Sequence, residues 1–597
     1  MKENLNSHDK EYEQFETMDI EDNIVKNKKR NKSSFLSPKN IIKTLLISVS
    51  VLCILIIIFQ FYRPKSDFSD DTLEKKEVPK PLKEPENKSE KEAETKKEIE
   101  SEKKPEVKKT QKSGDCSPGY KLVGNKCEIN HSIRAEYHTD KDNEKIKLIY
   151  FIPNFPMEMI IDGEYVEPTK EYTFPKMGNH TVYILSDFTK LTSTKRMFYQ
   201  IKSLHYLAFT HLFDTRNIVE MNNMFYECVY LTSIDLSHFN TEKVKTMELM
   251  FAGCHQLISI DLSNFNTKSV VSFANMFEDC VSLTKIDISN FNTKSANDLS
   301  FMFFGCMKLT SIDVSHFVTN KVTSLEYMFK GCESLTSIDL KNFNTENVSS
   351  LSRMFEGCIS LISLDLSNFN TKKVTTISSM FFDCFNLKSV NLKSFNTENV
   401  IAMNGLFHDC RSLTSIDINH FNTKNVINMN LMFNGCKSLT SLDISNFNTD
   451  KLEYFESIFQ DCTSLESINI THFKTDKVSS MISLFQGCRS LTSIDVTNFN
   501  TSQVTNMKHM FYDCDSLTSI DLSNFAIEQV SRMEYMFYKC SNLKYIDIST
   551  FDFENIKIVS LFNSLPDRGF IRIKKNLYER IKEDIPVEWE VSIVELS

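Results

Sequence analysis

Cysteines recur at one fixed spacing through the second half of the chain, and their thiols are the first groups to consider for chemistry. Thirteen of the 16 cysteines lie 26 residues apart, without an insertion. An odd number excludes complete pairing in disulfides, and no histidine or second cysteine accompanies the column at the spacing of a zinc site. Each cysteine ends an apolar stretch, where it behaves as a small buried hydrophobe. We therefore predict a structural ladder of free, buried thiols. It comprises Cys228, Cys254, Cys280, Cys306, Cys332, Cys358, Cys384, Cys410, Cys436, Cys462, Cys488, Cys514 and Cys540.

A second column carries carboxylates. The aspartate of Leu-Thr-Ser-Ile-Asp-Leu alternates with apolar residues, so we expect it to face outward from a strand. Adjacent carboxylates about 5 Å apart repel by roughly 1 kcal/mol in water, so other groups must offset the charge. Two interpretations stay open: hydrogen bonds from neighbouring Ser and Thr hydroxyls, or a stripe that binds a ligand or a cation such as calcium. The column comprises Asp235, Asp261, Asp287, Asp313, Asp339, Asp365, Asp417, Asp443, Asp495, Asp521 and Asp547, with Asn391 and Asn469 at the other two rungs.

Histidines share a third column, at His238, His316, His420 and His472. At least two repeats separate them, so they cannot form one metal site, and we predict neither a firm metal site nor a cofactor. The sequence also lacks a phosphate-cradling glycine loop, a His-Glu-x-x-His motif and a nucleophile with its base. Catalysis needs one asymmetric site, whereas these columns repeat along the chain. The sequence therefore predicts that the protein is not an enzyme.

A unit of 26 residues must position these columns. In the first regular unit, Leu231–Leu236 has the alternation of a strand, and Val244–Met247 is a second short extended piece. Met250–Cys254 has the apolar spacing of one helical turn. One unit cannot bury its apolar face alone, but stacked units bury it on each other. We predict a mainly β solenoid with short helical turns, made of 13 regular coils that span roughly 60 Å, with degenerate ends.

The repeated pattern is Leu-Thr-Ser-Ile-Asp-Leu-Ser-x-Phe-Asn-Thr-x-x-Val-x-x-Met-x-x-Met-Phe-x-x-Cys. It strongly resembles the 26-residue "bacterial surface protein" repeat of BspA-like leucine-rich repeat proteins, and residues 191–562 fit it. The resemblance implies a right-handed, leucine-rich-repeat-like solenoid that is often displayed on cell surfaces. Some relatives of this family are adhesins that bind host matrix proteins or other microbes.

Both ends of the solenoid are predicted to be covered. Residues 131–190 contain short alternating runs and a tight turn at Asp162-Gly163, which indicates a small β domain that caps the first coil. Residues 563–597 form the C-terminal cap. Within it, Ile571–Val594 reads as strand, helix and strand, with the helix at Asn576–Asp584.

The N-terminal 113 residues have the pattern of a membrane anchor with its flanking segments. Residues 44–62 are uncharged and apolar, long enough for a transmembrane helix, and lysines dominate the stretch before them. A cleaved signal peptide fits less well, because its charged region would be too long and no small-residue cleavage site follows. We predict a disordered cytoplasmic tail at 1–43, a signal anchor at 44–62 and a Lys/Glu-rich stalk at 63–113.

Residues 114–130 hold Cys116 and Cys127, which outside the cytosol can close a disulfide. The segment resembles the last loop of an EGF-like module, and a simple stapled turn is the alternative.

These features together predict a type II, single-pass protein of the plasma membrane with its C-terminal ectodomain outside. The net charge of −10 and pI of about 5.8 argue against a nucleic-acid partner. We predict an adhesin or recognition protein that binds an extracellular protein or glycan of a host, a matrix or a microbe. The alternative is a structural coat protein that self-associates laterally.

Overall fold

The computed structural model describes residues 120–123, 126–129, 131–152, 155–551 and 561–595, all within one compact unit, Lys109–Ser597. Among these residues no helix has the length and hydrophobicity to cross a bilayer. The predicted tail, anchor and stalk, residues 1–113, lie outside the described part of the chain, as does Cys116. The membrane anchor and the disulfide therefore stay predictions.

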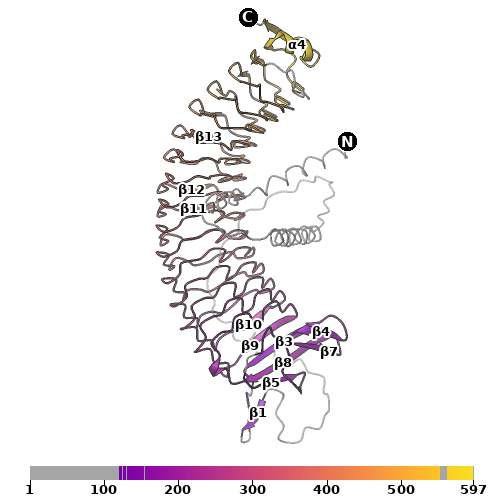
Figure 1. Ribbon diagram of the computed structural model, residues 1–597, viewed down its shortest axis with the longest axis vertical. Helices are drawn as coiled ribbons and strands as arrows, with labels where there is room; N and C mark the ends of the chain where they lie inside the picture. Colours follow the sequence, from indigo (N-terminus) through magenta and orange to yellow (C-terminus); the bar gives the residue numbers. More distant parts are fainter. Residues whose placement is uncertain (1–119, 124–125, 130, 153–154, 552–560, 596–597) are drawn as a thin grey trace, which may run out of the picture. The chain divides into compact units, whose positions relative to one another are not determined.

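An antiparallel sheet precedes the coils (Figure 1). The hairpin of β1 and β2 comes first, and the turn at Asp162-Gly163, with both residues at positive φ, joins β5 to β6. The small pair β4 and β7 lies beside the main strands. The strands are β1 (Tyr120–Val123), β2 (Lys126–Ile129), β3 (Ile133–Thr139), β4 (Glu144–Lys147), β5 (Met157–Ile161), β6 (Glu164–Val166), β7 (Glu171–Phe174) and β8 (Gly178–Ser186), followed by a 3-10 turn, η1 (Phe188–Lys190).

This sheet continues into the solenoid without a break. β9 (Leu204–Phe209) is the first strand of the coils and pairs in parallel with β10 (Ser233–Asp235). On its other edge β9 pairs antiparallel with β3, which gives a six-stranded sheet in the order β10-β9-β3-β8-β5-β6. The N-terminal sheet therefore covers the open strand edge of the first coil, an edge that would otherwise invite pairing with another chain.

The coils stack in register, which confirms the predicted mainly β solenoid. A row of parallel bridges steps by 26 residues from Glu220 through Thr246 and Ser272 onward. Its first step, from Ser193 to Glu220, is one residue longer. A second row holds the short strands β11 (Ser363–Asp365), β12 (Ser389–Asn391), β13 (Ser441–Leu442), β14 (Ser467–Ile468), β15 (Ser519–Asp521) and β16 (Tyr545–Ile548).

The predicted helical turns were wrong, since residues 191–551 contain no α-helix. The third side of each coil is a run of overlapping tight turns. In Met247–Cys254, the N–H groups of Leu249, Phe251 and Gly253 donate to carbonyls of the next coil at 3.0, 3.0 and 2.8 Å. The alternate N–H groups donate within the coil, to the carbonyl three residues back. Apolar residues spaced three and four apart are compatible with both an α-helix and a run of overlapping turns. Bonding to the next coil selects the turns, because an α-helix uses its N–H groups internally.

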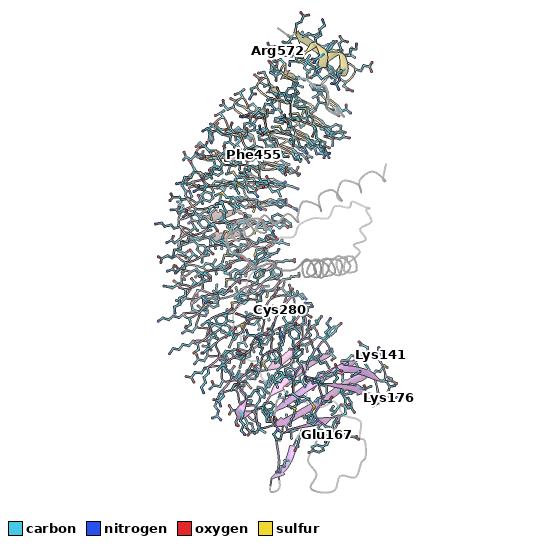
Figure 2. All side chains as sticks on the ribbon, viewed as in Figure 1. Lys141, Glu167, Lys176, Cys280, Phe455 and Arg572 are labelled. Carbon is cyan, nitrogen blue, oxygen red and sulfur yellow. The ribbon has the colours of Figure 1, made fainter. Side chains whose placement is uncertain are left out.

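Phenylalanine, methionine, leucine and cysteine fill the interior between the three sides (Figure 2). The ring of Phe277 stacks on that of Phe303 at 5.6 Å, with the planes 8° apart, and this stack continues along the coils. Stacked aromatic pairs stabilise by roughly 0.5–1.5 kcal/mol beyond the area that they bury. Every coil therefore contributes similar packing with its neighbours.

The row of short strands that ends at β16 is followed by a small cap. β16 pairs in parallel with β17 (Phe570–Lys574), which pairs in parallel with β18 (Glu590–Val594), and α4 (Lys575–Ile581) connects the last two. Trp589 is buried there, and its indole Nε1 donates to the Pro566 carbonyl at 2.8 Å. The strand–helix–strand order predicted for this segment is present.

Candidate binding surface

The thiol column lies wholly in the interior. All thirteen cysteines are buried and free. Each thiol donates to a phenylalanine carbonyl of the preceding coil, as Cys358 Sγ does to Phe329 O at 3.2 Å. Burial raises the pKa of Cys228, Cys332 and Cys540 to about 12. Protonated thiols without solvent access make poor nucleophiles, so this column supports the fold rather than a reaction.

A threonine column that sequence reasoning missed forms a second internal ladder. Thr241 Oγ1 donates to Asn266 O at 3.0 Å and accepts from Asn266 N at 2.7 Å, and Thr371 and Asn396 make the same reciprocal pair. These threonines are buried. The signal was the Thr that recurs every 26 residues from Thr215 to Thr501, because a buried hydroxyl needs partners and a repeated one finds them in the next coil.

The aspartate column closes a turn at the end of each strand. Ser315 donates to Asp313 Oδ1 through both its hydroxyl, at 2.6 Å, and its N–H, at 2.9 Å. These bonds hold the pKa of Asp313 below its usual value, and the same turn recurs along the column, with Asn391 and Asn469 in the same role. One oxygen of the carboxylate is thus engaged by its own coil at ten of the eleven aspartates, all but Asp417.

Asp547 departs from the predicted outward position. It is only 2% exposed, and Arg572 Nη1 of the C-terminal cap lies 3.3 Å from its Oδ2. The reason is that β17 adds to the sheet beside β16 and covers this rung.

The histidine column belongs to the packing between coils. His420 Nε2 lies 3.1 Å from Leu392 O, and His472 Nε2 lies 3.2 Å from Ile444 O. At the same position Asn264 Nδ2 donates to carbonyls of the coil before it. These histidines replace an asparagine that links neighbouring coils, and the structure does not bring the four together.

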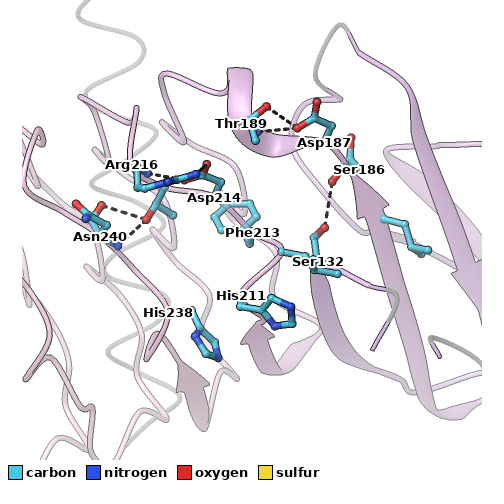
Figure 3. A pocket seen from close by; sticks show the side chains of 13 residues that line it. Ser132, Ser186, Asp187, Thr189, His211, Phe213, Asp214, Arg216, His238 and Asn240 are labelled. Carbon is cyan, nitrogen blue, oxygen red and sulfur yellow. Dashed lines mark hydrogen bonds and ion pairs between the residues drawn. The ribbon is translucent and has the colours of Figure 1, made fainter. Parts of the chain in front are cut away.

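A hollow of about 560 Å³ lies where the N-terminal sheet meets the first coil (Figure 3). His211 and His238 lie near each other there, with ring centroids 6.2 Å apart. Arg216 forms an ion pair with Asp214 at 2.7 Å, and this pairing holds the pKa of the Asp214 carboxyl below its usual value. The hollow breaks the repeat symmetry. Sequence reasoning missed it, because it depends on how β3 meets β9.

Four overlapping segments of the chain match one family model, described as "Mycoplasma protein of unknown function, DUF285". The matches cover residues 192–312, 297–415, 377–469 and 453–566, which together span most of the chain. The chain belongs to the DUF285 family. No curated protein matches it.

Two solved structures resemble the DUF285 chain. A leucine-rich cell surface protein from Faecalibacterium prausnitzii A2-165 is 18% identical over 61% of this chain and 83% of that chain, with a TM-score of 0.29. A TLR13–ssRNA13 complex is 14% identical over 63% of this chain and 78% of that chain, with a TM-score of 0.13. The BspA-like resemblance stays a prediction, since the matching family model carries another description.

Most inward positions of the DUF285 coils repeat, as do the outward aspartates, whereas other outward positions differ from coil to coil. One outward position on the turn side changes from Leu to Asn, Phe, Tyr and Arg over five successive coils, at Leu249, Asn275, Phe301, Tyr327 and Arg353. Large apolar side chains also lie exposed on several coils, at Ile258, Val271, Met307, Ile362 and Tyr454. This outer surface is the part of the solenoid available to a partner.

Proposed function

We propose that this DUF285 protein is a cell-surface recognition protein, an adhesin of the BspA-like kind. It binds a protein or glycan of a host cell, a matrix or another microbe through the outward side chains of its coils. The observation that carries the proposal is the contrast between a largely repeated interior and the outward positions that change from coil to coil.

The interior leaves little for a ligand to use. Stacked phenylalanine rings occupy it from coil to coil, together with hydrogen bonds from the cysteine thiols and the threonine hydroxyls to backbone groups. Most outward side chains do not take part in this packing. Because the outer surface extends along many coils, many weak contacts with one macromolecule add up to firm binding. Display at the surface is part of the proposal, with residues 44–62 as the anchor and the coils outside the plasma membrane.

The binding test uses the full-length chain in detergent, applied to intact host cells, immobilised matrix proteins and glycans. We expect saturable binding. Changing Ile258, Val271, Met307, Ile362 and Tyr454 together to Ser should weaken it at least tenfold. A matched variant with Thr→Ser at the exposed positions 284, 310, 336, 414 and 440 should bind normally. Self-association without binding to any of these targets would overturn the adhesin in favour of a coat protein.

The aspartate stripe is tested in the same assay. Asn391 and Asn469 make the same turn as the aspartates, so Asp→Asn removes charge while it preserves the fold. Asp313, Asp339, Asp365, Asp417 and Asp443 are changed together. Loss of binding both in this variant and in EDTA supports a calcium-loaded stripe, and unchanged binding in both discards it.

Surface display is tested separately by labelling intact cells with a reagent that does not cross membranes. We expect labelling of lysines in residues 120–597. Labelling only after the cells are lysed would contradict display.

A further inference from the structure

The residue before each cysteine follows a pattern that places two carboxylates on adjacent coils at one point of the column. It adopts positive φ and is Gly in six coils and Asp in five. Positive φ favours these residues, since Gly lacks a Cβ and Asp tolerates the conformation. Where Asp stands, the next coil usually offers Gly: a Cβ on Gly305 or Gly487 would overlap the carboxylate of Asp279 or Asp461.

Asp383 is not followed by such a glycine. The next coil places Asp409 there instead of Gly, and the column holds no other two successive aspartates. Two carboxylates on adjacent coils repel unless a cation lies near them. After Asp279, Asp409 and Asp461, the missing Cβ of a glycine in the next coil makes room for the carboxylate.

His408 lies beside the pair. One ligand atom each from Asp383, His408 and Asp409 lies within 4.8 Å of the other two, and all three residues are half-buried. His408 Nδ1 is 3.8 Å from Asp383 Oδ1. This nitrogen atom is itself buried and has no hydrogen-bond partner, although buried ring nitrogens normally find one.

The imidazole is held in place from the coil before it. The Phe382 ring stacks on His408 at 4.0 Å, with the planes 2° apart. Gly405 makes room for that ring, because a Cβ there would lie 3.2 Å from Phe382 Cδ2. The other coils carry a side chain at the position of Gly405. The two successive aspartates, the His408 nitrogen without a partner and the missing side chain of Gly405 therefore meet at one place.

The positive charge of Arg411 offsets the negative charge of one of the two carboxylates, that of Asp409. Its Nη2 lies 2.8 Å from Asp409 Oδ2, and its guanidinium also lies over the Phe385 ring at 4.0 Å. With Arg411 counted, the two carboxylates keep one net negative charge, beside an imidazole nitrogen without a hydrogen-bond partner. That combination suits one divalent cation.

We propose that Asp383, His408 and Asp409 bind a divalent transition-metal ion of the zinc class. Imidazole with carboxylates suits zinc and its neighbours, whereas calcium prefers oxygen ligands alone. Asp383 and His408 supply the two free ligand atoms, and the Asp409 carboxylate is shared between the metal and Arg411. Three protein ligands leave a coordination position open for water or for a group of a bound partner.

The test titrates the chelator-treated full-length chain with Zn²⁺ and, separately, with Co²⁺, whose absorption spectrum distinguishes nitrogen and oxygen ligands from thiolates. We expect one site with nitrogen and oxygen ligands. The variants Asp383→Asn and His408→Gln should each weaken it about 100-fold. The matched variants Asp461→Asn, at the position before the cysteine in another coil, and His420→Gln, at a histidine of a different column, should bind Co²⁺ as the parent does.

Thermal unfolding provides the second readout and checks that each variant is folded. Zn²⁺ at 100 times its dissociation constant should stabilise the parent by about 2.7 kcal/mol and leave the folded His408→Gln variant unchanged. Equal titrations for the parent and the cluster variants would overturn the proposal. A thiolate spectrum alone would also overturn it.

Discussion

At the residue scale, the buried thiols couple the fold to alkaline pH. Burial raises the pKa of Cys228, Cys332 and Cys540 from 9.0 to about 12. In the unfolded chain these thiols ionise near pH 9, whereas the folded chain keeps them protonated to about pH 12. The folded state therefore binds more protons in this window, and the free energy of unfolding falls as the pH rises.

We expect each such thiol to lower the free energy of unfolding by about 1.4 kcal/mol per pH unit between pH 9 and 12. Urea unfolding at pH 8, 9, 10 and 11 measures this dependence. Cys332→Ala serves as the control, because it removes one titrating thiol and should make the decline less steep. A free energy of unfolding that stays constant up to pH 11 would contradict the protonated ladder.

The threonine pairs make a separate prediction. Thr371→Val removes the hydroxyl that bonds both Asn396 O and Asn396 N, and it leaves two backbone groups without partners. We expect a loss of roughly 2–4 kcal/mol, from about 1–3 kcal/mol for each buried unpaired group. Thr371→Ser should lose far less, and the exposed Thr375→Val should change little. Urea unfolding compares the three, and equal effects of Val at positions 371 and 375 would refute the role of the ladder.

At the element scale, the positive-φ turns replace the helical turns that the apolar spacing predicted. Gly331 has φ of +71°, and the nearest atoms to a Cβ there would lie at an ordinary 3.5 Å. Substitution at this site therefore tests backbone conformation rather than crowding. We expect Gly331→Asn to cost little, since Asn tolerates this region, and Gly331→Val to cost about 2 kcal/mol or more. Thermal unfolding of both variants tests this prediction. Similar unfolding midpoints for Gly331→Asn and Gly331→Val would contradict the turn geometry.

The strands and their register were predictable from the sequence, because Leu231, Ile234 and Leu236 alternate and the unit never changes length. The turns were not predictable, because residues such as Met250 and Cys254 have the same spacing in a helix and in overlapping turns. The metal cluster was also missed, because His408 and Asp383 become neighbours only once adjacent coils are superposed. Departures from a repeat, such as Gly405, are the signal that sequence reasoning should have followed.

At the scale of the whole molecule, the two ends differ from the coils between them. β3 pairs with β9 at the first coil, and β17 with β18 extends the same row of strands beyond β16 at the last coil. Between these ends each coil contacts its neighbours through the same bonds and stacks. Stability is then approximately a sum over coils and their interfaces.

The central claim is that the coils share one backbone path and are structurally interchangeable, whichever apolar side chains fill them and whichever side chains face outward. Deleting residues 319–344, one full coil of 26 residues, joins Val318 to Thr345 and tests it directly. Circular dichroism and thiol labelling of the full chain carrying this deletion should show unchanged ellipticity per residue and protected thiols in all the remaining coils. The shorter deletion of residues 319–331, which breaks the register, should unfold the coils around it. The account is contradicted if the full-coil deletion unfolds as the shorter one does.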